Sequence, residues 1–268
     1  MTHNHQQETL SLVVWGQTNV GIVRGNNEDA FVVADLKTGH KAVPDTLFVT
    51  PVSRVGVLLA VSDGMGGASA GEVASQLVVD ALEYELSASR DEVVQHALKD
   101  AVEKANQLVW ETSRQQDLKG MGATLVAIVI SGTDAHVASV GDSRVYLIRG
   151  TAIWQVTKDQ SYVEMLVDSG AMTREQAEQS RFRNVILQAM GQSPEINVAQ
   201  DKIELQSGDV LLLCSDGLSG KVRSEEMCQS VLSHASLADA GHELIARANE
   251  RGGEDNITLI LSRLTEAN

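Results

Sequence analysis

The sequence contains few cysteine, proline or aromatic residues, and each shortage excludes a class of architecture. Its 268 residues include two cysteines, three prolines and 3% aromatic residues. Two cysteines cannot build a disulfide framework. With so little proline and no low-complexity linker, we expect one domain rather than two. Aliphatic residues and alanine must fill the core, and a chain of this length buries enough surface to need no covalent staple.

Positive charge and long apolar runs are scarce as well. The chain has 21 basic and 36 acidic residues, a net charge of -15. This balance argues against binding to nucleic acid, whose affinity comes mainly from Lys and Arg, and against docking on anionic membranes. No apolar run approaches the ~20 residues of a membrane helix. The polar N-terminal segment lacks the order of a signal peptide. We therefore expect a cytoplasmic protein.

Strand and helix patterns are mixed along the chain, with two groups of strands around a helical middle. A flexible tail at 1–10 and a loop insertion at 35–56 are also expected. The predicted strands lie at 11–24, 29–34, 55–61, 122–130, 135–140, 144–149, 152–157, 196–205, 209–214 and 257–264. The first predicted helix begins at Ser69, where Ser69 and Glu72 have capping-box spacing. Further helices are predicted at 91–115, 224–233 and 236–250, with short helices within 159–193. This arrangement predicts an α+β sandwich rather than alternating βαβ units.

Two apolar strands end in the same tripeptide. LLAVSDG at 58–64 and LLLCSDG at 211–217 each deliver an aspartate at the end of a strand, Asp63 and Asp216. ASVGDS at 138–143 delivers Asp142 in the same way. Further acids precede predicted strands, namely Glu28, Asp29 and Asp255. Such carboxylates are costly unless they are paired or bound to a cation, and the basic residues near them in sequence are few: Arg24, Arg144 and Lys221.

If these acids lie close together, a hard divalent cation that takes oxygen ligands is the simplest way to balance their negative charge. Several carboxylates could hold two such ions ~3.5–4 Å apart, an arrangement suited to in-line displacement at phosphorus. Each motif alone has a plainer interpretation, because Asp-Gly and Gly-Asp are common in turns and Asn27–Asp29 could be a solvated loop. An acid at the end of an apolar strand occurs several times in one domain, and this repetition favours the functional interpretation.

Other chemistries have less support. The glycine-rich run 64–67 could cradle a phosphate at a helix start, but neither a Walker loop nor a GxGxxG pattern is present. A metal contact through the Gly64 carbonyl fits better. The seven histidines show no ligand spacing, and Ser62 and Ser215 have no histidine in any shared motif, so a serine hydrolase lacks support. Cys214 is expected to be a small buried hydrophobe.

Taken together, the segments resemble the metal-dependent protein serine/threonine phosphatases of type 2C (PPM family), in their compact bacterial form. The resemblance covers about 13–265 and implies an α-β-β-α sandwich of two antiparallel sheets flanked by helices. It implies a single catalytic domain over 11–266 with a flap at 159–193. The segments that carry it, in order, are RGNNEDA (24–30), VSDGMGGASAGEVAS (61–75), GMGATLV (120–126), VASVGDSRVYLIR (137–149), TKDQS (157–161), GDVLLLCSDGL (208–218) and GGEDNIT (252–258).

The resemblance also implies a site with two Mn²⁺ or Mg²⁺ ions. In it Asp63 bridges both ions, the Gly64 carbonyl contacts one, and Asp216 and Asp255 hold the first. A water shared by the ions would attack phosphorus in line. The expected reaction is hydrolysis of phosphoserine and phosphothreonine in proteins.

The remaining site residues follow from the same resemblance. Glu28 and Asp29 serve the second ion, partly through water. Arg24 binds the substrate phosphate. Asp142 helps to hold a third, weaker ion. A cognate serine/threonine kinase is an expected partner.

The sequence departs from the family at three places. Met65 stands where many eukaryotic members have a histidine proposed as general acid, and methionine cannot donate a proton. The flap begins Asp159-Gln160-Ser161 rather than Asp-His-Ser, and the 35–56 connection is longer than usual. The proton donor stays open between water on a third ion, His40 and solvent. Two other functions also stay open, a non-catalytic cation-binding module on this fold and a small-molecule phosphomonoesterase.

Overall fold

The structure, a computed structural model, describes residues 10–89 and 93–266. Almost all of the tail expected at 1–10 and the first two residues of the helix expected at 91–115 lie outside the described residues. Leu10, placed in that tail, is already the first residue of strand β1. The tail prediction therefore extended one residue too far.

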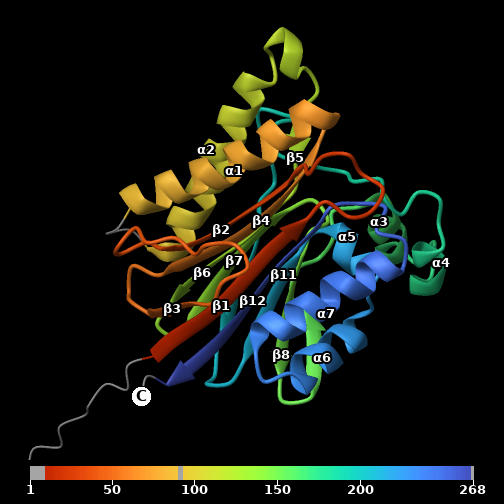
Figure 1. The fold of residues 1–268 in the computed structure, drawn as a ribbon. Coiled ribbons are helices and arrows are strands. Elements are labelled where there is room, and N and C mark those ends of the chain that lie inside the picture. The colour runs from red at the N-terminus through yellow and green to blue at the C-terminus, as the bar shows by residue number, and fades with distance from the viewer. Residues whose placement is uncertain (1–9, 90–92, 267–268) are drawn as a thin grey trace, which may run out of the picture.

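Two antiparallel sheets form the centre of the molecule, as Figure 1 shows. The first has the order β3 (Phe48–Pro51), β1 (Leu10–Asn19), β12 (Ile257–Glu266), β11 (Val210–Cys214), β8 (Arg144–Arg149) and β9 (Ala152–Gln155). The second has the order β10 (Ala199–Glu204), β7 (Asp134–Val140), β6 (Leu125–Ser131), β4 (Val57–Met65) and β2 (Asp29–Asp35), and β5 (Gly122–Ala123) pairs with the end of β4.

Helices cover the outer face of each sheet (Figure 1). Helices α1 (Ala68–Ala88) and α2 (Val94–Thr112) pack on the second sheet, and α6 (Ser224–Ser233) and α7 (Leu237–Glu250) pack on the first. Between β9 and β10 the chain forms α3 (Tyr162–Asp168) and α4 (Arg174–Glu178), beside the sheets. The short elements are α5 (Asp216–Ser219) and the 3₁₀ turn Gln116–Leu118. The layers confirm the predicted α-β-β-α sandwich.

The core explains why the central strands read as unbroken apolar runs. In β4, Val57, Leu59 and Val61 face the other sheet, while Leu58 and Ala60 face the helices. Because both faces of such a strand are buried, no polar residue alternates with the apolar ones. The ends of these strands are then the first places where polar groups can appear.

Three local predictions were wrong in informative ways. The strand expected at 11–24 stops at Asn19, where its partner β12 begins at Ile257, and 20–25 becomes a loop. The 35–56 segment is not all loop, because the edge strand β3 pairs with β1. Four residues ending in proline carry too little periodicity to show such a strand.

The third concerns the start of α1. The helix begins at Ala68, and Gly67 takes the N-cap position. The Gly67 carbonyl accepts hydrogen bonds from the amides of Ala70 and Gly71, at 2.9 and 3.1 Å. Ser69 is therefore inside the first turn and is not the capping residue.

Strand pairing brings distant segments to one end of the sandwich. Asp29 lies opposite Asp63 on neighbouring strands. In the other sheet Cys214 lies opposite Leu259 and Asn19 opposite Ile257, so β11 and β1 end where β12 starts. The acids predicted to converge are carried by these strand ends and the loops beside them.

Candidate functional site

A pocket of about 310 Å³ opens at this end of the sandwich. It collects five of the six predicted acids together with Arg24 and the glycine-rich turn. Its lining is Arg24, Glu28, Asp63, Gly64, Met65, Gly66, Gly67, Thr124, Asp142, Asn184, Ile186, Asp216, Asp255 and Asn256. The structure therefore brings together residues more than 200 positions apart in sequence.

Asp63 is held by its neighbours in the second sheet. Its backbone amide donates to Thr124 Oγ1 at 3.1 Å, and its carbonyl accepts from the Thr124 amide at 2.8 Å. Ser62, one residue earlier, donates its hydroxyl to the Thr124 carbonyl at 2.7 Å. These bonds fix the backbone on both sides of Asp63, so the carboxylate enters the pocket from a rigid strand.

Asp29 lies behind the pocket wall rather than in its lining. Its side chain is buried, and its Oδ2 accepts a hydrogen bond from the Ser215 hydroxyl at 2.7 Å. The same hydroxyl accepts from the Thr258 amide at 3.1 Å. Asp29 thus ties the strand end before Asp216 to the strand that carries Asp63.

Glu28 reaches the pocket beside helix α1. It is 7% exposed, and Asn26 donates to its Oε1 at 3.3 Å. A Cβ atom at Gly71 would overlap Glu28 Oε2. Glycine at position 71 is therefore needed for the carboxylate to fit against the first turn of the helix.

Arg24 and Asp255 meet at the pocket mouth. Arg24 Nη2 donates to Asp255 Oδ2 at 2.9 Å, and Nε donates to the Glu254 carbonyl at 3.3 Å. The Arg24 side chain is 46% exposed, so the guanidinium remains open to an anion. Lys221, which also lies near these acids in sequence, pairs with Glu254 instead.

Asn256 holds this loop in place. Its Nδ2 donates to the carbonyls of Val20 and Asn26, both at 3.0 Å, and its Oδ1 accepts from the Glu28 amide at 2.7 Å. The buried side chain therefore fastens the 20–28 loop to the start of β12. Spacing along the chain does not indicate this role, because the partners of Asn256 lie more than 225 positions away.

Asp142 enters the pocket from the turn between β7 and β8. Gly141, just before it, has φ +99°, and a Cβ there would press on Thr124. Only glycine combines this conformation with this close packing. Ser143, just after it, shares a 2.7 Å hydrogen bond with Thr124 Oγ1. Asp142 is thereby connected through Thr124 to Asp63.

The carboxylates raise one another's pKa values. Burial, together with repulsion from Asp29 and Asp216, raises the pKa of Asp63 well above its usual range. Burial raises the pKa of Asp142 to about 7, with repulsion from Asp216 and Asp159, while Arg144 opposes the shift.

Two further acids shift in the same direction. Burial raises the pKa of Asp29 to about 7 in spite of hydrogen bonds from Thr258 and Ser215. Burial and Asp255 raise the pKa of Asp216, against the attraction of Arg144 and Arg24. The two arginines therefore leave the cluster short of positive charge.

The donor set suits hard divalent cations. Within the ranges that the structure describes, no three acidic, histidine or cysteine side chains are already arranged to hold a metal ion. However, the groups that converge offer oxygen atoms only, four of the acids hold raised pKa values, and the Gly64 carbonyl lies in the same lining. Mg²⁺ and Mn²⁺ prefer such ligands, so these residues fit the predicted ions.

Neither Met65 nor His40 places a titratable group in the pocket. Met65 lines the pocket, and its sulfur accepts from Gln192 Nε2 at 3.5 Å. His40 is exposed in the loop after β2 and is absent from the lining. Asn184 and Ile186 reach the pocket from the segment between α4 and β10, and no sequence signal had marked either one.

Comparisons with known proteins identify the family of the chain. A family model described as protein phosphatase 2C matches residues 44–262. The chain is 34% identical over 250 residues to the serine/threonine phosphatase stp of Listeria welshimeri, covering 91% of this chain and 93% of that protein. It is 36% identical over 259 residues to the serine/threonine protein phosphatase PstP of Mycobacterium tuberculosis, covering 96% of this chain and 46% of that protein.

A solved structure matches as well. The catalytic domain of PstP in complex with two manganese ions superposes with a TM-score of 0.80 at 34% identity, covering 96% of this chain and all of that one. The matched family range leaves out Arg24, Glu28 and Asp29, which lie in the part of the chain that only the relatives cover. None of the helices in the described part of the chain has the length and hydropathy that a bilayer crossing requires.

Proposed function

This chain belongs to the protein phosphatase 2C family and is a metal-dependent serine/threonine protein phosphatase, and from that premise we propose which of its residues perform the reaction. The observation that carries the proposal is the convergence of five carboxylates from separate segments in one pocket. Together with the raised pKa values, it supports a site built to hold divalent cations.

The ion-holding residues are divided between the two sheets. We assign Asp63 to both ions, with the Gly64 carbonyl on one of them. Asp216 and Asp255 hold the first ion, and Glu28 holds the second. When bound, the two cations, Mn²⁺ or Mg²⁺, would acidify a water and neutralise the phosphoryl group. Asp29, behind the wall, orients the site through Ser215 and acts on the second ion through water.

Arg24 is assigned to the substrate phosphate. Its guanidinium lies at the pocket mouth, half-exposed, with Asp255 holding one edge. The fork geometry of arginine suits two phosphate oxygens. Arg24 would orient the phosphoryl group and offset the charge that develops on its oxygens.

Asp142 is assigned to help hold a weaker third cation, which would supply the water that protonates the leaving alkoxide. Met65 cannot donate a proton, and the described lining contains no histidine. The segment 159–193 is assigned as a flap, because Asn184 and Ile186 line the pocket. The substrates are phosphoproteins, and a cognate serine/threonine kinase that creates them is part of the proposal.

The test compares a phosphothreonine peptide with a small aryl phosphate. With Mn²⁺ we expect phosphate release from both, and with a chelator we expect none. Activity that survives exhaustive chelation would contradict the cation mechanism. Aryl phosphate turnover without peptide turnover would instead favour a small-molecule phosphomonoesterase, and binding without turnover would favour a non-catalytic module.

A further inference from the structure

The turn that carries Asp142 is held by one glutamine from outside the strands. The Gly141 amide donates to Gln160 Oε1 at 2.8 Å, and the Gln160 amide donates to the Gly141 carbonyl at 2.8 Å. Both hydrogen-bonding groups of Gly141 are therefore satisfied by Gln160. We propose that Gln160 is a positioning residue for Asp142; this inference rests on the proposed role of Asp142 in the same site.

The same side chain also reaches the far end of the flap. Gln188 Nε2 donates to Gln160 Oε1 at 3.0 Å, and the Leu187 amide donates to the Gln160 carbonyl at 2.7 Å. Gln160 Nε2 donates to the Asn197 carbonyl at 3.1 Å. Gln160 thus joins the first residues of the 159–193 segment to its last ones, next to Ile186 in the pocket lining.

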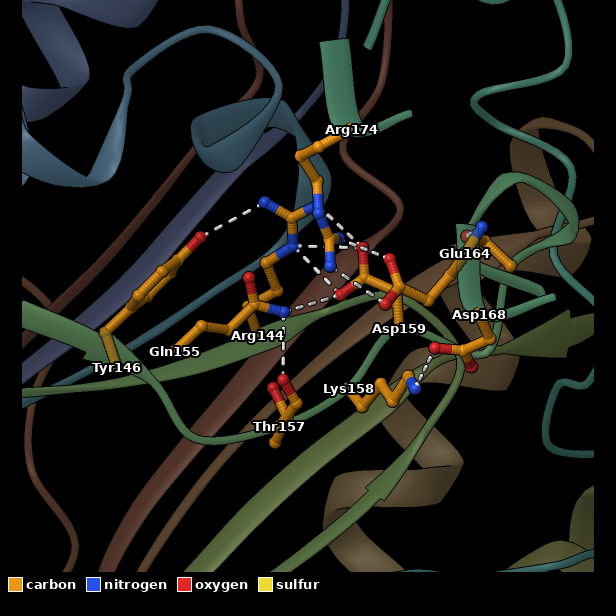
Figure 2. Close-up of polar contacts among 10 residues, drawn as sticks. Arg144, Tyr146, Gln155, Thr157, Lys158, Asp159, Glu164, Asp168 and Arg174 are labelled. Atoms are coloured by element: carbon orange, nitrogen blue, oxygen red, sulfur yellow. Dashed lines mark hydrogen bonds and ion pairs between the residues drawn. The ribbon is translucent and has the colours of Figure 1, made fainter. Parts of the chain in front are cut away.

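A partly buried ion pair fixes the residue before Gln160 (Figure 2). Arg144 Nε donates to Asp159 Oδ1 at 3.0 Å, and Nη2 donates to Oδ2 at 2.6 Å. Arg144 Nη1 donates to the Tyr146 hydroxyl at 3.1 Å, and Gln155 Nε2 donates to Asp159 Oδ1 at 2.9 Å. Strand β8 therefore holds Asp159, which leaves the Gln160 side chain aimed at Gly141.

These contacts surround Asp142 on both sides. On one side Gln160 holds Gly141, and on the other Ser143 bonds Thr124, which bonds the amide of Asp63. Asp142 itself lies in the same pocket lining as the carboxylates of Asp63 and Asp216. A carboxylate in such surroundings needs a rigid backbone to stay in position when no cation is bound.

The chemistry of an amide suits this task. One glutamine side chain can accept a hydrogen bond from the Gly141 amide and donate another to the Asn197 carbonyl at the same time. It has no net charge and does not titrate, so it adds no repulsion to the acidic pocket. Methionine is close in volume but replaces the amide with a thioether, a weak acceptor, so Gln160→Met separates hydrogen bonding from packing.

Two variants form a matched pair. Gln160→Met removes the side-chain bond to the Gly141 amide and keeps the backbone bond to the Gly141 carbonyl. Gln188→Met removes bonds to Gln160 and Asn197 on the flap side and leaves both Gly141 bonds in place. Asp142→Ala is the reference for loss of the carboxylate. Gln160→Ala, which removes the amide by truncation, replaces the methionine variant if that variant does not fold.

The first readout needs no turnover. Native-state hydrogen exchange of the Gly141 amide should accelerate at least ~10-fold in Gln160→Met, because its acceptor is lost. Titration of the protein with Mn²⁺, followed by paramagnetic resonance, should show the weakest site losing affinity about tenfold, the lower end for losing a bond that orients a ligand. Gln188→Met should leave both quantities within about twofold of the wild type.

The second readout is the kcat/KM ratio for phosphopeptide over aryl phosphate. It should fall in Gln160→Met in the direction seen for Asp142→Ala, and stay unchanged in Gln188→Met. If Asp142→Ala weakens the site and lowers the ratio while folded Gln160→Met does neither, the positioning role is wrong and the proposed function stands. If Asp142→Ala changes neither quantity, the assigned role of Asp142 fails and the inference fails with it.

Discussion

The tripeptide Ser-Asp-Gly occurs twice at the end of an apolar strand and folds in two different ways. At 62–64 it continues strand β4, which runs to Met65 and pairs with β5. At 215–217 strand β11 has already ended at Cys214, and Asp216 begins the short helix α5. One aspartate is thus a strand residue and the other the first residue of a helix, yet both carboxylates line one pocket.

The difference arises from what surrounds each copy. Beside Asp63, Thr124 offers backbone and side-chain partners, so the strand continues. Beside Gly217, the Asn256 carbonyl lies too close for any Cβ, and the chain turns into a helix against the start of β12. The tripeptide specifies a carboxylate at a strand end, and the neighbouring strands decide the backbone that presents it.

Replacing each aspartate with asparagine is the strongest way to separate the two copies. We expect Asp63→Asn and Asp216→Asn each to lower turnover at least ~100-fold, as for the loss of a key electrostatic group. Because Asp63 is assigned to both ions and Asp216 to one, excess Mn²⁺ should recover part of the activity in Asp216→Asn only. The measurement is kcat against Mn²⁺ concentration, with melting curves to show that each variant is folded.

If excess Mn²⁺ restored activity equally in the two variants, the assignment of Asp63 to both ions and Asp216 to one would be wrong. Near-normal activity in folded Asp63→Asn would contradict the site itself.

The second prediction concerns the metal-free protein, in which the carboxylates of both copies repel one another. Burial raises the pKa of Asp29 from 3.8 to about 7, equivalent to at most roughly 4 kcal/mol. A raised pKa means that the folded state disfavours the charged form. Stability is therefore fully present below about pH 4 and is lost as the pH rises toward 7.

Thermal melting at pH 5 and pH 7.5, with chelator and with Mn²⁺, tests this expectation. The melting temperature without metal should be lower at pH 7.5, and Mn²⁺ should remove most of that difference. In Asp142→Asn the pH dependence without metal should be weaker, because Asp142 also titrates near 7. A metal-free protein that is equally stable at both pH values would contradict the burial of uncompensated acids.

The sequence predicted best the strands that are buried on both faces, and it predicted edge strands and strand ends poorly. Strands such as β4 and β11 are buried on both faces and read as apolar runs, so their positions were predictable. The edge strand β3 and the end of β1 were not, because the partner strand sets their limits. The start of α1 was misplaced because Gly67, which has no side chain to cap the helix, takes the N-cap position, and its carbonyl accepts the first helical hydrogen bonds.

The site shows the same division. The recurrence of an aspartate at the end of an apolar strand identified Asp63, Asp142 and Asp216. The family resemblance added roles for these residues, and those roles remain proposals. No pattern along the chain indicated that Asn256 fastens the 20–28 loop or that Asn184 lines the pocket. Such residues act through contacts across long sequence separations, which spacing along the chain cannot reveal.

Replacing Arg24 tests a smaller difference between the two Ser-Asp-Gly copies. Burial and Asp255 raise the pKa of Asp216, and the charge of Arg24 opposes this rise. Arg24 also pairs with Asp255 beside the helix-start copy. Arg24→Ala should lower kcat/KM about tenfold and weaken inhibition by inorganic phosphate by a similar factor, as for the loss of a charged hydrogen bond at a half-exposed site. Arg24→Lys should recover only part of both. Phosphate inhibition that stays unchanged in Arg24→Ala would argue against phosphate binding by this residue.

The two serines that precede the aspartates give the smallest and most direct comparison. Ser62 donates to a neutral carbonyl, that of Thr124, whereas Ser215 donates to the buried carboxylate of Asp29 and accepts from the Thr258 amide. Ser62→Ala should cost about 1 kcal/mol of unfolding free energy, and Ser215→Ala about 2 kcal/mol, because a hydroxyl bond to a charged group contributes more. Denaturant unfolding of the metal-free proteins measures both.

The charge of Asp29 makes the comparison depend on pH. Near pH 5 that carboxyl is mostly protonated, since its pKa is about 7, and the Ser215 hydroxyl then faces a neutral group. The excess cost of Ser215→Ala over Ser62→Ala should therefore be larger at pH 8 than at pH 5. Equal costs at both pH values would mean that the second serine, like the first, only satisfies a neutral acceptor, and that the two copies differ in backbone alone.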